Sequence, residues 1–293
     1  MKYFPFFILL GALLISCEKY IDMEIPDNGR KIVINSIYND NTDIVINLTM
    51  SRFILDNSDY KPLSGATVEL YENDVFIGNL NESEAGMYIS SGFRATTGSK
   101  QKIIISKGDQ TITAISYLPN KVPITFIDTT RVQKDYMKLL RFRFSVSDPS
   151  TTDNFYMIGF AMEDSLTQGL MERYSIYFYT DDPFIEKTGT EAYGVFSDES
   201  FKGQTKTLAI DIDLYNFSAD TTVMYVSLLS VSKDTYLYIK SANAQMSNSS
   251  PFSEPIMVYS NIDNGFGIFG GYSIYKDSII IYGPLAEEYP IGL

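Results

Sequence analysis

Short runs of alternating hydrophobic and polar residues recur along most of the chain, separated by turn-forming residues. In residues 66–71, Ala66, Val68 and Leu70 alternate with polar or amphipathic residues, which is typical of a strand with one buried face. Residues 32–38 and 44–50 are rich in β-branched side chains and flank the turn formers of residues 39–43, which predicts a hairpin. We predict further strands at residues 75–80, 86–89, 102–106, 111–117, 124–133, 139–147, 155–162, 174–179, 207–214, 223–231 and 272–282.

A helical pattern stands out in residues 233–246. This segment has no proline or glycine, follows Ser232 as an N-cap, and places Tyr236 and Ile239 near one another.

Pro119 and Pro123 restrict the chain and mark a domain boundary. The predicted fold is therefore all-β, with an immunoglobulin-like sandwich at residues 31–118. A larger antiparallel β-sandwich domain with one surface helix follows at residues 119–293.

The N-terminus has the layout of a bacterial secretory signal. Lys2 precedes an apolar run from Phe4 to Leu14, which is shorter than the roughly 20 residues that cross a bilayer as a helix. Ser16 and Cys17 follow, and a small residue before cysteine is typical of a lipoprotein cleavage site. We predict a signal peptide at residues 1–16, lipidation of Cys17 and a tether at residues 17–30. Ordinary cleavage near Ser16, leaving a free N-terminal cysteine, is the alternative.

The composition of the chain excludes several kinds of catalytic and metal site. The chain has no histidine, no tryptophan and one cysteine, so Ser-His and Cys-His relays, a conventional zinc site and disulfides are excluded. A net charge of −13 disfavours nucleic acid as a partner and direct adsorption on anionic lipid. The 22 tyrosines and 19 phenylalanines suit contact surfaces, although their preference for strands explains them equally simply.

Two carboxylate pairs are the candidates for catalysis. Asp211 and Asp213 are expected on one face of a strand, roughly 7 Å apart, and Asp181 and Asp182 lie near a turn. Glycosidases use paired carboxylates, but 36 acidic residues make accidental pairs common, and we predict no catalytic residues. A Ser-Lys dyad would need a proximity that no motif indicates.

Residues 40–43, Asp-Asn-Thr-Asp, offer hard oxygen ligands for calcium, but no complete calcium loop is present. We therefore predict no cofactor and no metal site, and whether calcium binds stays open.

The glycines at residues 265–271 alternate with Phe266, Ile268 and Phe269, and their spacing matches no nucleotide fingerprint. A bulged or closely packed strand is the better interpretation.

Several of these segments together resemble one family. They are Cys17-Glu18-Lys19 with Ile21-Asp22, residues 62–70, residues 249–255, residues 259–262 and the glycine-rich residues 265–270. The chain is similar to the Bacteroidetes outer-membrane lipoproteins that contain a domain of unknown function and are often encoded beside TonB-dependent receptors. The resemblance implies an outer-membrane location through the lipid on Cys17 and a TonB-dependent receptor as partner. It implies no catalytic residues and no ligand.

Three functions follow as hypotheses. The first is a non-catalytic binding or accessory lipoprotein in nutrient uptake, based on Cys17, the missing catalytic groups and the resemblance. The second is an adhesive or structural surface lipoprotein, based on the immunoglobulin-like pattern of residues 31–117. The third, a glycan-processing enzyme, depends only on carboxylates such as Asp211 and Asp213. The ligand, and whether the protein faces the periplasm or the cell surface, stay open.

Overall fold

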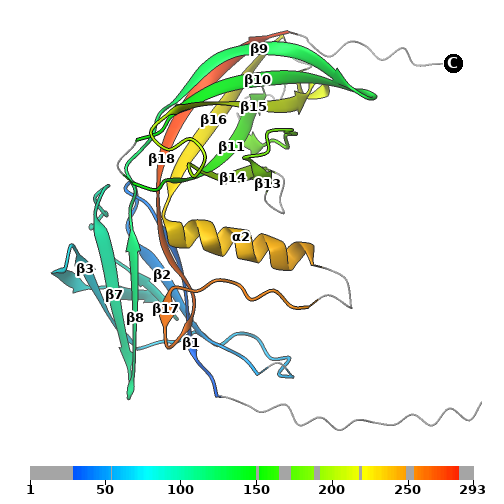
Figure 1. Cartoon of the computed structure of the whole chain (residues 1–293). Coiled ribbons are helices and arrows are strands. Elements are labelled where there is room, and N and C mark those ends of the chain that lie inside the picture. Colours follow the sequence, from blue (N-terminus) through cyan, green and yellow to red (C-terminus); the bar gives the residue numbers. More distant parts are fainter. Residues whose placement is uncertain are drawn as a thin grey trace, which may run out of the picture.

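The computed structural model describes residues 29–53, 55–149, 152–164, 173–187, 192–217, 220–248 and 254–283 (Figure 1). These residues form two β-sandwiches and one α-helix, which confirms the prediction of an all-β fold with one helix. The predicted signal peptide, Cys17 and the tether up to residue 28 lie outside the described residues.

The first sandwich is built from residues that follow the predicted tether. One of its sheets has the order β18-β1-β2-β6-β5, in which β18 is Phe266–Tyr282, and the facing sheet has the order β17-β8-β7-β3-β4. Ile34, Leu48, Val68 and Ile103 are fully buried between them. The strands are β1 (Ile32–Tyr38), β2 (Val45–Met50), β3 (Thr67–Glu72), β4 (Val75–Asn79), β5 (Asn81–Glu84), β6 (Met87–Ile89), β7 (Lys100–Lys107), β8 (Gln110–Tyr117) and β17 (Ile262–Asp263).

The second sandwich packs around a phenylalanine-rich core. The ring centroids of Phe144 and Phe160 are 5.8 Å apart, and those of Phe160 and Phe178 are 5.3 Å apart. Its sheets have the orders β13-β14-β11-β16-β18 and β15-β10-β9, and β12 pairs with β11. The elements are β9 (Ile124–Lys134), β10 (Met137–Ser147), β11 (Phe155–Asp164), β12 (Arg173–Ser175), β13 (Glu186–Lys187), β14 (Tyr193–Ser197), β15 (Thr205–Asp213), the 3₁₀ helix η1 (Leu214–Asn216), β16 (Thr221–Val231) and β18 (Phe266–Tyr282).

Strand β18 belongs to both sandwiches. Residues 266–271 pair in parallel with β1, and residues 272–282 pair antiparallel with β16. Phe269 is buried in the first core and Ile281 in the second. The predicted division at residues 118 and 119 therefore needs a correction: residues 262–271 pair with strands of the first sandwich. An alternating pattern shows that a segment is a strand but not which strand it pairs with.

Helix α2 (Lys233–Ser247) confirms the predicted helix and its N-cap. Ser232 is extended, with φ −62° and ψ 155°, and its Oγ accepts a hydrogen bond from Thr235 N at 3.1 Å. Ser232 N also donates to Gly271 O at 2.8 Å, which fixes the start of the helix to β18. Figure 1 shows α2 projecting from the shared sheet at the level where the two sandwiches meet. No helix in the described ranges combines the length and hydropathy needed to span a bilayer.

The glycine-rich segment at the start of β18 is closely packed, as predicted. Gly267 has φ +101°, and a Cβ there would lie 1.9 Å from Ile34 O. A Cβ on Gly270 would lie 2.1 Å from Thr235 Oγ1 at the start of α2. Glycine therefore allows both the parallel pairing with β1 and the close approach of the helix.

We expect Gly267→Ala to destabilise the protein far more than Gly108→Ala. Both glycines have positive φ, and a left-handed conformation costs an alanine roughly 1–2 kcal/mol. A Cβ on Gly108 meets no atom within 4 Å, whereas one on Gly267 overlaps the backbone of β1. Urea unfolding of the two variants checks this difference. Equal losses of stability would show that the contact between β18 and β1 is not tight.

Candidate functional site

Asp211, one of the predicted candidates for catalysis, is buried in an ion-pair cluster. It lies on β15 between Ile210 and Ile212, which face the core, so its side chain points to the opposite face of the sheet. Arg141 Nε donates to Asp211 Oδ1 at 2.7 Å, and Arg141 Nη2 donates to Asp211 Oδ2 at 2.9 Å. Lys134 Nζ lies 2.7 Å from the same Oδ2, and the Asp211 side chain is 1% exposed.

Asp181 belongs to the same cluster, although the sequence analysis placed it in a separate pair. Its carboxylate forms an ion pair with Lys134 and lies 3.8 Å from Arg141 Nη2. The segment reaches the cluster because Tyr179 and Asp211 exchange backbone hydrogen bonds of 2.7 and 2.8 Å. Two carboxylates thus face two cations, and the cluster is formally neutral.

The other carboxylate of each predicted pair accepts a hydrogen bond from a backbone N–H group instead. Asp213 Oδ1 accepts a hydrogen bond from Tyr215 N at 2.9 Å and caps η1. Asp182 Oδ1 accepts one from Phe184 N at 3.1 Å. Neither of the two predicted pairs is therefore a pair of free carboxylates facing a common space.

The electrostatics of the cluster do not suit acid catalysis. Burial opposes the charge of Asp211, but the hydrogen bonds from Arg141 and Lys134 outweigh burial and lower the pKa of Asp211. The hydrogen bond to Asp211 raises the pKa of Arg141 in turn. The general acid of a glycosidase needs a raised pKa, so this cluster is better suited to holding β9, β10 and β15 together.

The oxygen-rich residues 40–43, which were considered as calcium ligands, contact their own turn and neighbouring segments of the chain. Asn39 Oδ1 accepts hydrogen bonds from Asn41 N at 2.7 Å and Thr42 N at 3.1 Å. Asp40 pairs with Lys121 at 2.8 Å, and Asp43 Oδ2 accepts from Gly92 N at 3.1 Å. Across the ranges that the structure describes, no three His, Cys, Asp or Glu side chains gather in a metal-binding arrangement.

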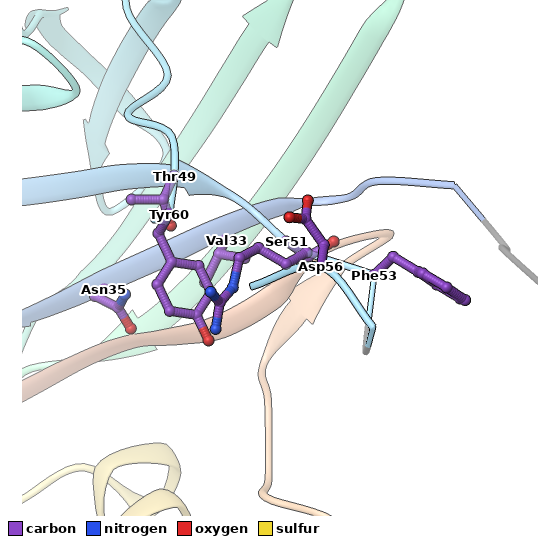
Figure 2. A pocket seen from close by; sticks show the side chains of 8 residues that line it. Val33, Asn35, Thr49, Ser51, Phe53, Asp56 and Tyr60 are labelled. Atoms are coloured by element: carbon purple, nitrogen blue, oxygen red, sulfur yellow. The ribbon is translucent and has the colours of Figure 1, made fainter. Parts of the chain in front are cut away.

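An open pocket of about 590 Å³ lies on the outer face of the first sandwich (Figure 2). The outward residues of β1 and β2 form its floor, where Val33 lies opposite Thr49 in the strand register. The chain after β2 forms its wall, and Figure 2 shows Phe53 extending away from Tyr60. The lining residues are Val33, Asn35, Thr49, Ser51, Arg52, Phe53, Asp56 and Tyr60.

The pocket combines a stacked cation with a carboxylate. The guanidinium carbon of Arg52 lies 4.1 Å from the centroid of the Tyr60 ring, and Arg52 Nη1 donates to Ser58 O. Arg52 Nε is buried and has no hydrogen-bond partner within the described structure. Backbone and side-chain hydrogen bonds from Ser58 are the main causes that lower the pKa of Asp56, and Arg30, at 3.1 Å, contributes as well. The pocket therefore offers donors, an ionised acceptor and an aromatic ring.

No pattern in the sequence indicated this pocket. Asn35 and Thr49 follow the ordinary alternation of outward strand positions, and residues 51–53 and 55–60 are irregular and contain no motif. The available signal was weak: an arginine, two aspartates and two aromatic residues within ten positions after a strand. A pattern of this kind does not show that the segment folds back over the sheet.

We expect Asp211→Asn to destabilise the protein at neutral pH by at least about 2 kcal/mol, because it leaves Arg141 and Lys134 facing a neutral amide. The folded-state pKa of Asp211 is lowered, so its stabilisation is present above the ordinary pKa of about 3.9 and is lost as pH falls through the folded pKa. The difference from wild type should shrink in acid. Urea unfolding across pH measures it.

Asp128→Asn is the matched control, because Asp128 pairs with Arg143 on the same sheet but is 39% exposed. An exposed pair contributes little, so this variant should stay close to wild type. If both variants were equally stable at neutral pH, the buried cluster would not be structural.

Comparison with known proteins was made by sequence and by structure. The comparison with curated proteins found no match. A β-glucuronidase of Bacteroides uniformis has 11% identity and a TM-score of 0.22, and the match covers 68% of this chain but 23% of the enzyme. A candidate carbohydrate-binding protein of the same species has 10% identity and a TM-score of 0.19, with 86% and 98% of the two chains covered.

These structural likenesses are too low to support a functional argument, and the chain spans only about a quarter of the length of the glucuronidase. A family profile, in contrast, matches the sequence of most of the chain. The profile of the DUF4249 family, a domain of unknown function, matches residues 18–278. The chain therefore belongs to the DUF4249 family.

Proposed function

We propose that this protein is a lipid-anchored, non-catalytic binding protein of the outer membrane, and that its pocket takes a small polyhydroxylated ligand such as a sugar. The observation that carries the proposal is the lining of the pocket, where Arg52, Asp56 and Tyr60 border the floor formed by Val33, Asn35 and Thr49. Ligand sites typically combine an apolar surface with a few directed polar groups.

The lining favours a neutral, polyhydroxylated ligand over two other classes. A purely apolar ligand would desolvate Asn35 and Arg52 without giving them hydrogen bonds, which is unfavourable. A strongly anionic ligand would meet the ionised carboxylate of Asp56. A sugar can donate to Asp56, accept from the guanidinium of Arg52, and place its C–H groups against Tyr60.

Binding without catalysis is consistent with the other groups of the chain. The sequence contains no histidine and no second cysteine, so the common nucleophile–base relays cannot be built. Asp211 is neutralised by two cations, and its lowered pKa opposes a role as a general acid. The pocket itself holds one carboxylate, Asp56, whereas glycoside hydrolysis usually needs two.

The anchor and the partner are part of the proposal. Lipidation of Cys17 would hold the protein at the membrane, because two or more acyl chains give stable anchoring. The resemblance to lipoproteins encoded beside TonB-dependent receptors supports such a receptor as the partner. In this role the protein would deliver, or hold in place, a ligand that the receptor takes up.

We expect Arg52→Ala to weaken sugar binding about tenfold or more, because a hydrogen bond to a charged group typically contributes roughly 1.5–3 kcal/mol. Calorimetric titration against a panel of oligosaccharides measures this. Lys102→Ala is the matched control, since Lys102 stacks over Tyr71 at 4.4 Å on the other sheet of the same sandwich. Unchanged affinity in Arg52→Ala, or no binding of any sugar by wild type, would contradict the assignment of the pocket.

We expect Cys17→Ala to release the protein from the outer membrane, or to block its maturation, because no other anchor is predicted. Membrane fractionation and mass spectrometry of the mature N-terminus measure retention and acylation.

Extraction of wild type in mild detergent should recover a TonB-dependent barrel with the protein, and extraction of the variant should recover none. Unchanged retention and processing of Cys17→Ala would refute the anchor, and a solitary wild-type protein would argue against the receptor.

A further inference from the structure

The described chain begins beside the pocket and is fastened to the pocket wall. Lys31 N donates to Ser51 Oγ at 2.9 Å, and Ser51 N donates to Lys31 O at 2.8 Å. Arg30 reaches Asp56 with an ion pair of 3.1 Å. The place where the predicted tether leaves the first sandwich is therefore held in position next to residues 51–60.

Cations and exposed apolar side chains lie together at this end of the sandwich. The Leu55 side chain is 67% exposed and Phe266 is 48% exposed. Lys31 Nζ lies 5.2 Å from the centre of the Phe266 ring, which connects the start of β1 to the start of β18. Lys61 O accepts a hydrogen bond from Met50 N at 3.0 Å, and Met50 pairs with Ile32 at the start of β1. We call the following group the tether-side patch: Arg30, Lys31, Leu55, Lys61 and Phe266.

The described residues at this end carry a charge opposite to that of the whole chain, whereas the predicted tether, residues 17–28, contains four carboxylates and one lysine. The chain carries a net charge of −13. Over residues 29–33 and 49–61, however, four cations meet two carboxylates, and Arg30 pairs with one of these, Asp56. These charged residues are Arg30, Lys31, Arg52, Lys61, Asp56 and Asp59.

The length of the preceding chain limits how far this end can lie from a membrane. Residues 17–28 separate the predicted lipid on Cys17 from Gly29. Twelve residues span at most about 40 Å, since an extended chain covers roughly 3.3–3.6 Å per residue. An acyl group on Cys17 would thus keep the tether-side patch within about 40 Å of the bilayer, a distance from which the patch can reach the lipid surface.

We propose that the tether-side patch lies against the phospholipid surface of the leaflet that holds the acyl chains of Cys17. This inference depends on the lipid anchor of the proposed function. Basic residues near a membrane are attracted to anionic headgroups, and exposed apolar side chains enter the interface beside them. The acyl chains supply the attachment and the patch sets the orientation, so that the pocket opens at the edge of the bilayer.

The chain has no tryptophan, so one introduced tryptophan is a unique fluorescent reporter. Leu55→Trp places it in the patch, and Phe76→Trp is the matched control, because Phe76 is 52% exposed on β4. β4 pairs with β3 in the sheet that faces β1 and β2, and Figure 1 shows β3 to the left of β1. Both variants are prepared as full-length, lipidated protein and reconstituted into vesicles of brominated phosphatidylcholine and phosphatidylglycerol.

The expected result is several-fold stronger quenching of Leu55→Trp than of Phe76→Trp by the brominated lipid. High salt, or the added substitutions Arg30→Gln and Lys31→Gln, should reduce the difference, because salt screens attraction to headgroups. Vesicle flotation is measured first. Protein that does not float overturns the anchor and this inference together, whereas floating protein with equal quenching of the two variants overturns the docking of the patch alone.

Discussion

Strand β18 forms hydrogen bonds with β1 in one half and with β16 in the other, and this pairing holds the two sandwiches in one continuous sheet. The parallel half of β18 pairs residues 266–271 with residues 33–38 of β1, which lie more than 200 residues earlier in the sequence. This pairing forms only after a long loop has closed. Closing the loop costs conformational entropy before the pairing can stabilise the fold. The stability of the whole arrangement therefore depends on how closely β18 can approach β1.

Two other features depend on the same contact. Gly267 lets β18 lie against the backbone of Ile34, and Gly270 leaves room for Thr235 at the start of α2. The outward face of β1, once β18 is in place, supplies Val33 and Asn35 to the floor of the pocket. The glycines have no chemistry of their own, yet they decide how closely β1 and the start of α2 can approach β18.

Local patterns in the sequence predicted the helix, its N-cap and most of the strands, because these depend on neighbouring residues, but they did not indicate β5, β13, β14 or β17. The close packing of the glycine-rich segment was also predictable, since few other reasons place so many glycines within a strand. The shared role of β18 was not, because alternation contains no information about a distant partner. The contact between Asp181 and Asp211 was not predictable either, because it is made through Lys134 and Arg141 on other strands. The pocket combines two strands with an irregular segment, and no local pattern brings these together.

The length of β18 also separates the two ends of the molecule. Its 17 residues, at about 3.3 Å each, span up to about 56 Å. Its first residue, Phe266, belongs to the tether-side patch, and its last residues lie in the second sandwich. With the patch on a lipid surface, the strand would hold the second sandwich away from the bilayer, beyond the headgroups. A protein that extends from the same membrane would then meet the second sandwich, while the pocket stays near the lipid, so the two sandwiches are suited to different contacts.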